Sequence, residues 1–372
     1  MEKSDLKYWL ALVRVPFFGA VRIGKLFRAF PNMERAFCAS QSELLEAEIE
    51  PEIVNRFLQG RYHLDPDREL EKLHTAGLNV LTCKDDLYPT LLSHIENPPV
   101  LLFYRGIIPD QTRKHIAVVG SREVTAYGTR AIEHIVEPLA KSGVVIVSGL
   151  AYGVDALAHQ TTLKHGGTTI AVLGTGADEA SLYPATNRHL ASQIVAKGGA
   201  IISEFPIGTP GLKHHFPMRN RIIAGLCHGT LVIEAAQKSG SLITAKYALE
   251  NGRDVYAVPG AINESLSEGP NNLIKMGASL VTEASDIIHT IQKTKTSDNT
   301  SLPASKISPI SPYQPRSETE RIILSFLSTQ PVHMDEIANA CVIPMSTISS
   351  TLTLLEMKGV IRHEGGKYYT RS

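Results

Sequence analysis

The stretch HIAVVGSREVTAYG, from His115 to Gly128, decides the fold class of this chain. A β-branched apolar run ends in Gly and Ser, and the residues after that turn can begin a helix. Near-continuous Val and Ile runs that alternate with helical segments predict a doubly wound α/β domain with a mainly parallel sheet. Between Leu78 and Thr282 the other runs are LLFYRG, VVIVSG, TIAVLG, AIISEF, TLVIEA, DVYAVPG and SLVT.

The residues before this domain have a different pattern. Residues 1–75 read as short helices broken by prolines, which predicts a helical module. Within it, VPFFGAVRIGKLF resembles the turn of a helix-hairpin-helix, whose backbone N–H groups contact phosphate. The same residues also fit a packing or interaction module, such as a sterile-alpha-motif-like one, because Gly19 and Gly24 can simply mark breaks between helices.

The α/β domain is expected over residues 78–289, and two further parts follow it. Residues 290–316 are rich in Ser, Thr, Pro and Lys without apolar periodicity, which predicts a flexible linker. Residues 317–372 contain three helical patterns and a Gly-Gly turn, which predicts a winged-helix domain. Its third helix, Met345 to Met357, contains no Lys or Arg, and the domain holds five basic and six acidic residues. We therefore expect this domain to bind protein rather than to read DNA.

Composition excludes several classes of protein. The 372 residues contain 37 Lys and Arg against 37 Asp and Glu, so affinity for a polyanion must come from a local patch. The N-terminus lacks a signal-peptide pattern and no apolar run is long enough to cross a membrane, so we expect a cytoplasmic protein. The four cysteines lie far apart and include no C-x-x-C pair, so their spacing does not match a zinc-binding motif. We expect neither a metal nor a cofactor.

The turns after the predicted strands indicate an anion site. Gly120 is followed by Ser121 and Arg122, and the next glycine is Gly128, so the pattern is not that of a dinucleotide-binding domain. A Ser-Arg turn before a helix suits a phosphate, although an exposed turn with a solvated arginine is the plain alternative. Three further turns, SGLAYGVDALAH, LGTGADEASLYPATNRHL and AAQKSGSLITAKYALENG, follow strands of the same sheet. Because ligands gather at the carboxyl ends of such strands, we expect one anion-binding rim.

The stretch KHHFPMRNRIIAGL, residues 213–226, concentrates positive charge near that rim. No acidic residue stands between Glu204 and Glu234. The chain lacks a P-loop, and several cationic turns suit a polymer of phosphates better than a mononucleotide. Phe216 can stack a base, as aromatic side chains of single-strand binders do, although it can equally be a core aromatic. Adjacent histidines point apart in an extended loop, so His214 and His215 are not expected to bind a metal.

The motifs GSREVTAYG, SGLAYGVDALAH, SEFPIGTPGLKHHFPMRNRIIAGL, SGSLITAKYALENGRDVYAVPG and GPNNLIKMGA resemble the DNA-processing protein A (DprA/Smf) family. The resemblance covers residues 78–285. It implies an extended Rossmann-like domain that binds single-stranded DNA without sequence preference, forms a homodimer and helps to load the RecA recombinase during natural transformation. It implies no catalytic activity. The residues that match the DNA pocket of the family are Gly120, Ser121, Arg122, Gly211, Lys213, Phe216, Arg219 and Asn220.

On physical grounds we add Lys238, Ser239, Gly240 and Ser241, where a helix opens after a strand. In the mechanism that we expect, Arg122, Lys213 and Arg219 neutralise successive phosphates while Phe216 stacks a base.

Two other functions are weighed against DNA binding. The segment RNRIIAGLCHGTLVIEA also resembles lysine-decarboxylase-like phosphoribohydrolases, which cleave nucleoside monophosphates. The Pro-Gly-Gly of their motif is missing here, and Glu234 falls one residue later than that motif requires. The third possibility is an adaptor that meets other proteins through its terminal domains.

Overall fold

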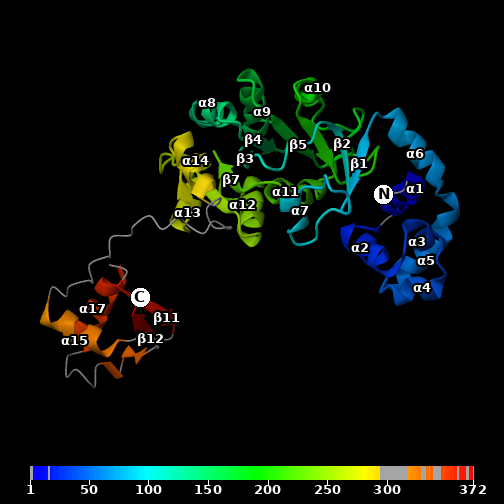
Figure 1. Ribbon diagram of the computed structural model, residues 1–372. Coiled ribbons are helices and arrows are strands. Elements are labelled where there is room, and N and C mark those ends of the chain that lie inside the picture. The colour runs from blue at the N-terminus through cyan, green and yellow to red at the C-terminus, as the bar shows by residue number, and fades with distance from the viewer. Residues whose placement is uncertain are drawn as a thin grey trace, which may run out of the picture. The chain divides into compact units, whose positions relative to one another are not determined.

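The computed structural model describes residues 3–15, 17–293, 317–327, 332–334, 336–337, 345–357, 360–365 and 368–371 (Figure 1). The chain forms two compact units, Met1–Asp298 and Asn299–Ser372. The first unit holds the predicted helical module and the α/β domain. In the described residues, no helix has both the length and the apolar character that a membrane span requires.

A sheet of nine strands organises the first unit, with the order β1-β2-β6-β5-β4-β3-β7-β8-β9. The seven strands from β6 to β9 in this order are parallel, which confirms the predicted doubly wound, mainly parallel sheet. The strands are β1 (Asn79–Thr82), β2 (Leu101–Gly106), β3 (His115–Val119), β4 (Val145–Ser148), β5 (Thr169–Leu173), β6 (Ala200–Ser203), β7 (Gly229–Val232), β8 (Asp254–Ala257) and β9 (Ser279–Leu280).

The two strands at one edge differ from the expected pattern. Strand β2 runs antiparallel to β6, with Phe103 opposite Ser203, and β1 runs antiparallel to β2. Strand β1 is not among the predicted strands, because its four residues are too few for a periodic signal. The antiparallel pairing is possible because no crossover helix is needed to join β1 to β2.

Helices cover both faces of this sheet (Figure 1). One face packs against α8, α9 and α14, and α10 extends that layer near β5 and β6. The other face packs against α7, α11 and α12. All residues of β3 to β7 are buried, as expected for strands covered on both sides. The helices are α7 (Thr90–Ser93), α8 (Ala126–Lys141), α9 (Val154–Lys164), α10 (Arg188–Ala196), α11 (His215–Gly225), α12 (Ser241–Glu250), α13 (Glu268–Lys275) and α14 (Ala284–Lys293).

The N-terminal module is helical, as predicted, and packs directly on the sheet. Its core contains Trp9 and Phe57, and the same cluster includes Leu101 of β2. Arg14 also donates from Nη1 to the carbonyl oxygen of Ile207, at 2.6 Å. The module and the α/β domain therefore share one apolar core. Its helices are α1 (Lys3–Val13), α2 (Ala20–Ala29), α3 (Met33–Cys38), α4 (Gln41–Glu46), α5 (Pro51–Gly60) and α6 (Pro66–Thr75).

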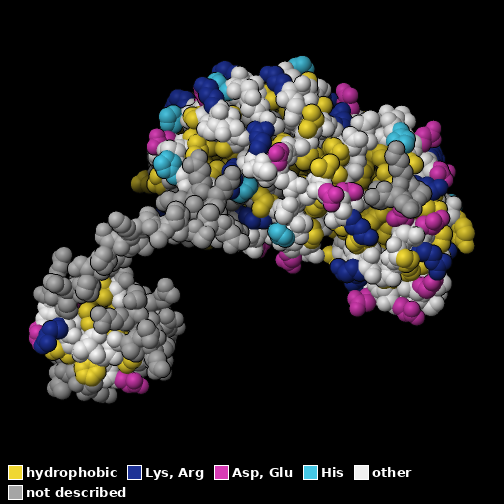
Figure 2. Space-filling model, viewed as in Figure 1, with side chains coloured by type: hydrophobic (Ala, Val, Ile, Leu, Met, Phe, Trp, Pro, Cys, Tyr) yellow, Lys and Arg dark blue, Asp and Glu magenta, His cyan; other side chains and the backbone are white. Residues whose placement is uncertain are grey.

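Basic and acidic side chains lie next to one another over these helices (Figure 2). Arg22 pairs with Glu50 at 2.8 Å, and Lys25 lies 3.7 Å from Glu48. Paired charges give little net field, so the segment that resembles a helix-hairpin-helix lacks the unpaired cations of a phosphate-binding surface.

The second unit contains α15 (Glu318–Phe326), β10 (Val332–His333), α17 (Met345–Met357), β11 (Ile361–Gly365) and β12 (Tyr368–Arg371). Its strands form an antiparallel sheet in the order β10-β12-β11. Helix α17 has the bounds predicted for the third helix, whereas most of the predicted second helix lies outside the described residues. Helix α14 continues over residues 290–293, which were predicted as linker, and residues 294–316 lie outside the described residues.

Candidate nucleic-acid interface

A cavity of about 780 Å³ opens at the carboxyl ends of β3, β4 and β7. This is the edge at which doubly wound sheets bind their ligands. Every residue that the sequence predicted for the site lines this one cavity, called the cleft below. The twelve are Gly120, Ser121, Arg122, Gly211, Lys213, Phe216, Arg219, Asn220, Lys238, Ser239, Gly240 and Ser241.

The turn after β3 holds Arg122 at the cleft by close backbone packing. A Cβ atom on Gly120 would lie 2.7 Å from Val154 and 2.9 Å from the carbonyl oxygen of Glu234, so only glycine fits without a shift. The backbone N–H of Ser121 donates to that same carbonyl at 2.7 Å. The Ser121 hydroxyl donates to the carbonyl of Glu123 at 2.9 Å. Ser121 therefore stabilises the turn with its hydroxyl, and the turn presents the exposed Arg122 side chain.

Phe216 is the central aromatic residue of the cleft. Its ring lies 5.7 Å from the ring of Tyr183, and the guanidinium of Arg122 lies over it at 5.8 Å from the centroid. A Cβ on Gly211 would approach the Phe216 ring to 3.3 Å, and one on Gly174 to 2.9 Å, so two glycines let the backbone pass close beside the ring. The half-buried ring keeps part of its surface open to a stacking partner.

The loop after β5 contains an aromatic and a basic side chain, Tyr183 and Arg188, and one of the two lines the cleft. Tyr183, which is 47% exposed, lines the cleft as its position after β5 predicts. Arg188 instead donates to the carbonyl of Ala180 at 2.9 Å and does not line the cleft. The sequence analysis missed Tyr152, which is 44% exposed and lines a small slot beside Phe216. An aromatic residue directly after the β4 turn was the available signal.

Arg219 does not occupy the exposed position that the sequence analysis expected. Its side chain is only 4% exposed, and Nη1 donates to the carbonyl oxygens of Gly149, at 2.7 Å, and Val172. A Cβ on Gly149 would lie 2.6 Å from the guanidinium, so glycine makes room for it. Because α11 turns this residue toward the sheet, Arg219 forms the floor of the cleft and does not project to a phosphate.

Asp155 shares this buried environment with Arg219. Its carboxylate accepts hydrogen bonds from the backbone N–H groups of Gly149, at 3.0 Å, and Ala151, at 3.3 Å. Burial lowers the pKa of Arg219 to about 10, and the nearby carboxylate opposes that shift. Burial also raises the pKa of Asp155, against the effect of Arg219. The two charges therefore stabilise each other beneath the cleft.

The cleft carries unpaired positive charge. Arg122, Lys213 and Lys238 are exposed, and none has an ion-pair partner among the described residues. The one acidic residue in the lining is the buried Asp155. Helices α11 and α12 begin at the cleft without an acidic residue in the first turn, so their N-terminal dipoles add to the field. This combination attracts polyanions.

The turn before α12 is tied to α11. The side-chain amide of Asn220 donates to the carbonyl of Gly240 at 3.2 Å. The hydroxyls of Ser239 and Ser241 lie 2.7 Å apart, in hydrogen-bond contact. The first contact links the turn that follows Lys238 to the helix that carries Phe216.

Glu234, the residue compared above with the glutamate of the phosphoribohydrolase motif, does not line the cleft. It is 4% exposed, and its carboxylate accepts from the backbone N–H of Thr125, at 3.0 Å, and from the Thr125 hydroxyl. Glu234 thereby stabilises the start of α8 and does not line the cleft. The ring of His215 stacks on the ring of Phe205, with 4.1 Å between their centroids. Among the described residues there is no group of three or more side chains that could hold a metal ion.

Comparison with protein families matches both units of the chain. Residues 79–292 match the family model described as DNA recombination-mediator protein A. Residues 307–367 match the model described as the DprA winged helix domain, which confirms the fold class predicted for the C-terminal domain.

Individual relatives agree with these matches. Protein Smf of Synechocystis is 35% identical over 400 residues, with 100% of both chains covered. DNA processing protein DprA of Streptococcus pneumoniae is 48% identical over 204 residues, which cover 55% of this chain and 71% of that protein. The crystal structure of the Streptococcus pneumoniae protein aligns with a TM-score of 0.65 at 36% identity, covering 76% of this chain and 97% of that one.

A structure of DNA processing protein A from Helicobacter pylori, which concerns the single-stranded DNA binding mode of that protein, aligns with a TM-score of 0.51 at 28% identity. The alignment covers 59% of this chain and 98% of that one.

Proposed function

This chain belongs to the DNA recombination-mediator protein A (DprA/Smf) family, and we propose that its cleft binds single-stranded DNA without sequence preference. The observation that carries the proposal is the position of Phe216 among Arg122, Lys213 and Lys238, three exposed cations without an acidic partner in the described residues. Single-strand binders combine positive side chains along the backbone with aromatic faces for the bases.

In the proposed mechanism the three exposed cations neutralise phosphates, and the N-termini of α11 and α12 add to the positive potential. Phe216 stacks a base, and Tyr183 offers a second aromatic face beside it. Arg219 acts from below the cleft, because it links the turn after β4, at Gly149, to strand β5, at Val172, and contributes charge without touching a phosphate. This role replaces the direct phosphate contact that the sequence suggested.

The wider role that we propose is that of a mediator of recombination. Bound to incoming single-stranded DNA, the protein protects the strand and helps to load the RecA recombinase during natural transformation. A homodimer would hold one long strand at two clefts and raise avidity through effective concentration. The winged-helix domain binds protein in this scheme. The function needs no catalytic step, no metal and no cofactor.

Fluorescence anisotropy tests the proposal directly. The full-length chain is titrated into labelled poly-dT, a labelled mixed-sequence strand and the matching duplex at several salt concentrations. We expect similar affinities for both single strands and weaker binding to the duplex. The log-log salt slope should be about −0.7 for each phosphate contact. Binding that is independent of salt, or a preference for the duplex, contradicts the proposal.

A further inference from the structure

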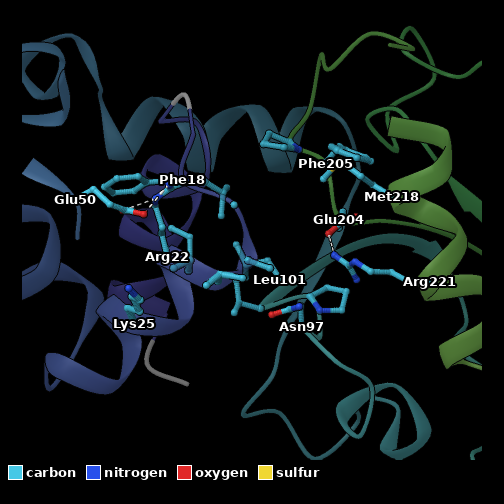
Figure 3. A pocket seen from close by; sticks show the side chains of 18 residues that line it. Phe18, Arg22, Lys25, Glu50, Asn97, Leu101, Glu204, Phe205, Met218 and Arg221 are labelled. Carbon is cyan, nitrogen blue, oxygen red and sulfur yellow. Dashed lines mark hydrogen bonds and ion pairs between the residues drawn. The ribbon is translucent and has the colours of Figure 1, made fainter. Parts of the chain in front are cut away.

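A second cavity of about 440 Å³ lies between the N-terminal module and the α/β domain (Figure 3). Its walls come from α2, from the loop before β2 and from α11. Most of the lining is apolar, and Phe18, Leu101 and Phe205 are buried in it. Pockets of about 300 to 1,000 Å³ with mainly apolar walls commonly bind ligands at the boundary between domains.

The cavity and the cleft lie on opposite sides of α11. Phe216 and Arg219 of this helix line the cleft, whereas Met218 and Arg221 line the cavity. Figure 3 shows Met218 and Arg221 reaching from α11 toward the side chains of the N-terminal module. A group bound in the cavity would therefore contact the helix that carries the cleft residues.

The charges of the cavity are paired, unlike those of the cleft. Arg221 pairs with Glu204, both side chains being nearly buried, and Arg22 pairs with Glu50 at 2.8 Å (Figure 3). The remaining cation, Lys25, lies 3.7 Å from Glu48. A phosphate would have to break one of these pairs, so the cavity does not suit nucleic acid. An uncharged ligand can enter without that cost.

Some polar atoms of the cavity lack a partner among the described residues. Glu204 Oε1 and Arg221 Nη1 are buried without a hydrogen bond. Asn97 is exposed at the cavity, has no hydrogen bond from its side chain to the described residues and adopts a left-handed φ of 55°. A side-chain amide offers one donor and one acceptor group, which match the C=O and N–H of a peptide group.

The mouth of the cavity continues its apolar surface outward. Val21 on α2 is 52% exposed and Met218 on α11 is 45% exposed, and both line the cavity. These apolar side chains stand beside the polar Glu50 and Asn97 at the rim, and a mainly apolar pocket of this kind can bury an anchor side chain of a protein partner. A small molecule that fits inside would leave Val21 and Met218 uncovered.

We infer that this cavity binds a short, uncharged, apolar peptide segment of a partner protein. Apolar side chains of the segment fill the space between Phe18 and Phe205, and the side-chain amide of Asn97 pairs with one of its backbone peptide groups. Because the charges are paired, this binding is insensitive to salt. The inference goes beyond DNA binding and does not depend on it, since the cavity and the cleft share no lining residue.

The test uses a phage-displayed library of short random peptides, selected on the immobilised full chain without DNA. Enriched peptides are synthesised, and their affinity for the protein in solution is measured by calorimetry at low and high salt. We expect apolar, uncharged sequences whose affinity changes less than about twofold with salt. Val21→Asp and Met218→Asp should each weaken binding by about tenfold or more, because a charge would be buried at the mouth.

Two further variants sharpen the result. Asn97→Gly accepts the left-handed backbone and removes only the side-chain amide, so we expect a loss of about fivefold, equivalent to one neutral hydrogen bond. Leu249→Asp is the control, since Leu249 is 55% exposed on α12 and does not line the cavity. Thermal unfolding verifies that each variant is folded.

The inference is overturned if no peptide is enriched above a surface without protein, or if enriched peptides bind the Val21→Asp and Met218→Asp variants as tightly as the wild type. It is also overturned if poly-dT displaces the peptides and Lys213→Glu weakens their binding, because the peptides would then occupy the cleft. DNA affinity is measured separately, so a failure here leaves the proposed function untouched.

Discussion

The guanidinium of Arg122 lies over the ring of Phe216, 5.8 Å from its centroid, although Arg122 belongs to the turn after β3 and Phe216 to the start of α11. This contact places a positive charge over the aromatic face, and the ring of Tyr183 lies 5.7 Å from the same ring. We therefore expect a base that stacks on Phe216 to have its phosphate close to Arg122. The cleft combines the two elements of single-strand recognition at one point.

Replacing Phe216 by alanine should weaken binding of poly-dT by about 5- to 150-fold, because one stacked base contributes about 1 to 3 kcal/mol. Phe216→Trp should retain most of the affinity, since it keeps an aromatic face. The matched control is Tyr62→Ala, which removes an aromatic residue that is 85% exposed on the N-terminal module. Equal losses in Phe216→Ala and Tyr62→Ala would show that stacking in the cleft is not the cause.

Charge reversal of Lys213 or Lys238 should reduce both the affinity for single strands and its salt dependence. Each lost phosphate contact should make the log-log salt slope less negative by about 0.7. Lys246→Glu is the control, because Lys246 lies on α12 with a side chain that is 74% exposed and pairs with Glu250 outside the cleft. If the slope stays unchanged in both cleft variants, these lysines do not contact phosphates.

Arg219→Met should destabilise the protein by about 3 kcal/mol, because it removes two buried hydrogen bonds and leaves buried Asp155 without its neighbouring charge. Arg122→Met should change stability by less than about 0.5 kcal/mol, since Arg122 is exposed. The affinity of the folded protein for DNA should show the opposite order, with a larger loss for Arg122→Met than for Arg219→Met. Urea unfolding and fluorescence anisotropy, measured on both variants, decide whether Arg219 supports the cleft from below or binds a phosphate directly.

Stability should fall below about pH 6.5 in part because of His159. This residue is fully buried, and burial lowers its pKa to about 3, whereas an unfolded chain protonates histidine near ~6.5. The unfolded state binds one more proton than the folded state in this range. The contribution of neutral His159 to the free energy of unfolding is therefore complete above pH 6.5, and it decreases by about 1.4 kcal/mol per pH unit as the pH decreases toward 3. His159→Gln should reduce this slope, and exposed His189→Gln should not. Unfolding by urea between pH 7 and 4 measures the difference.

Truncation after Lys293 should leave most of the affinity for single-stranded DNA, because all the cleft residues lie in the first unit. The cut belongs after Lys293 rather than before Thr290, since α14 continues to Lys293 and Ile291 is 2% exposed in the core. A loss of more than about tenfold would assign DNA binding to the C-terminal part. Retained DNA binding with loss of a protein partner would fit the proposed role of the winged helix.

Much of this arrangement followed from local sequence. The alternation of β-branched runs with helical segments predicted the sheet, because a strand covered on both faces must be apolar along its whole length. The turns after those strands predicted the cleft, since parallel strands end at a common edge. For this reason the sequence places Ser121, Phe216 and Lys238, which lie far apart in the chain, at one site.

The tertiary structure decided what local patterns do not encode. The basic run Lys213 to Arg221 appears as one cationic patch in the sequence, but its positions on and before α11 face three environments. Lys213 faces the cleft, Arg219 lies under it, and Arg221 pairs with Glu204 beside the second cavity. Residue type determined that these side chains are charged, whereas the rotation of one helix between the sheet and the N-terminal module determined which charge remains free for a ligand.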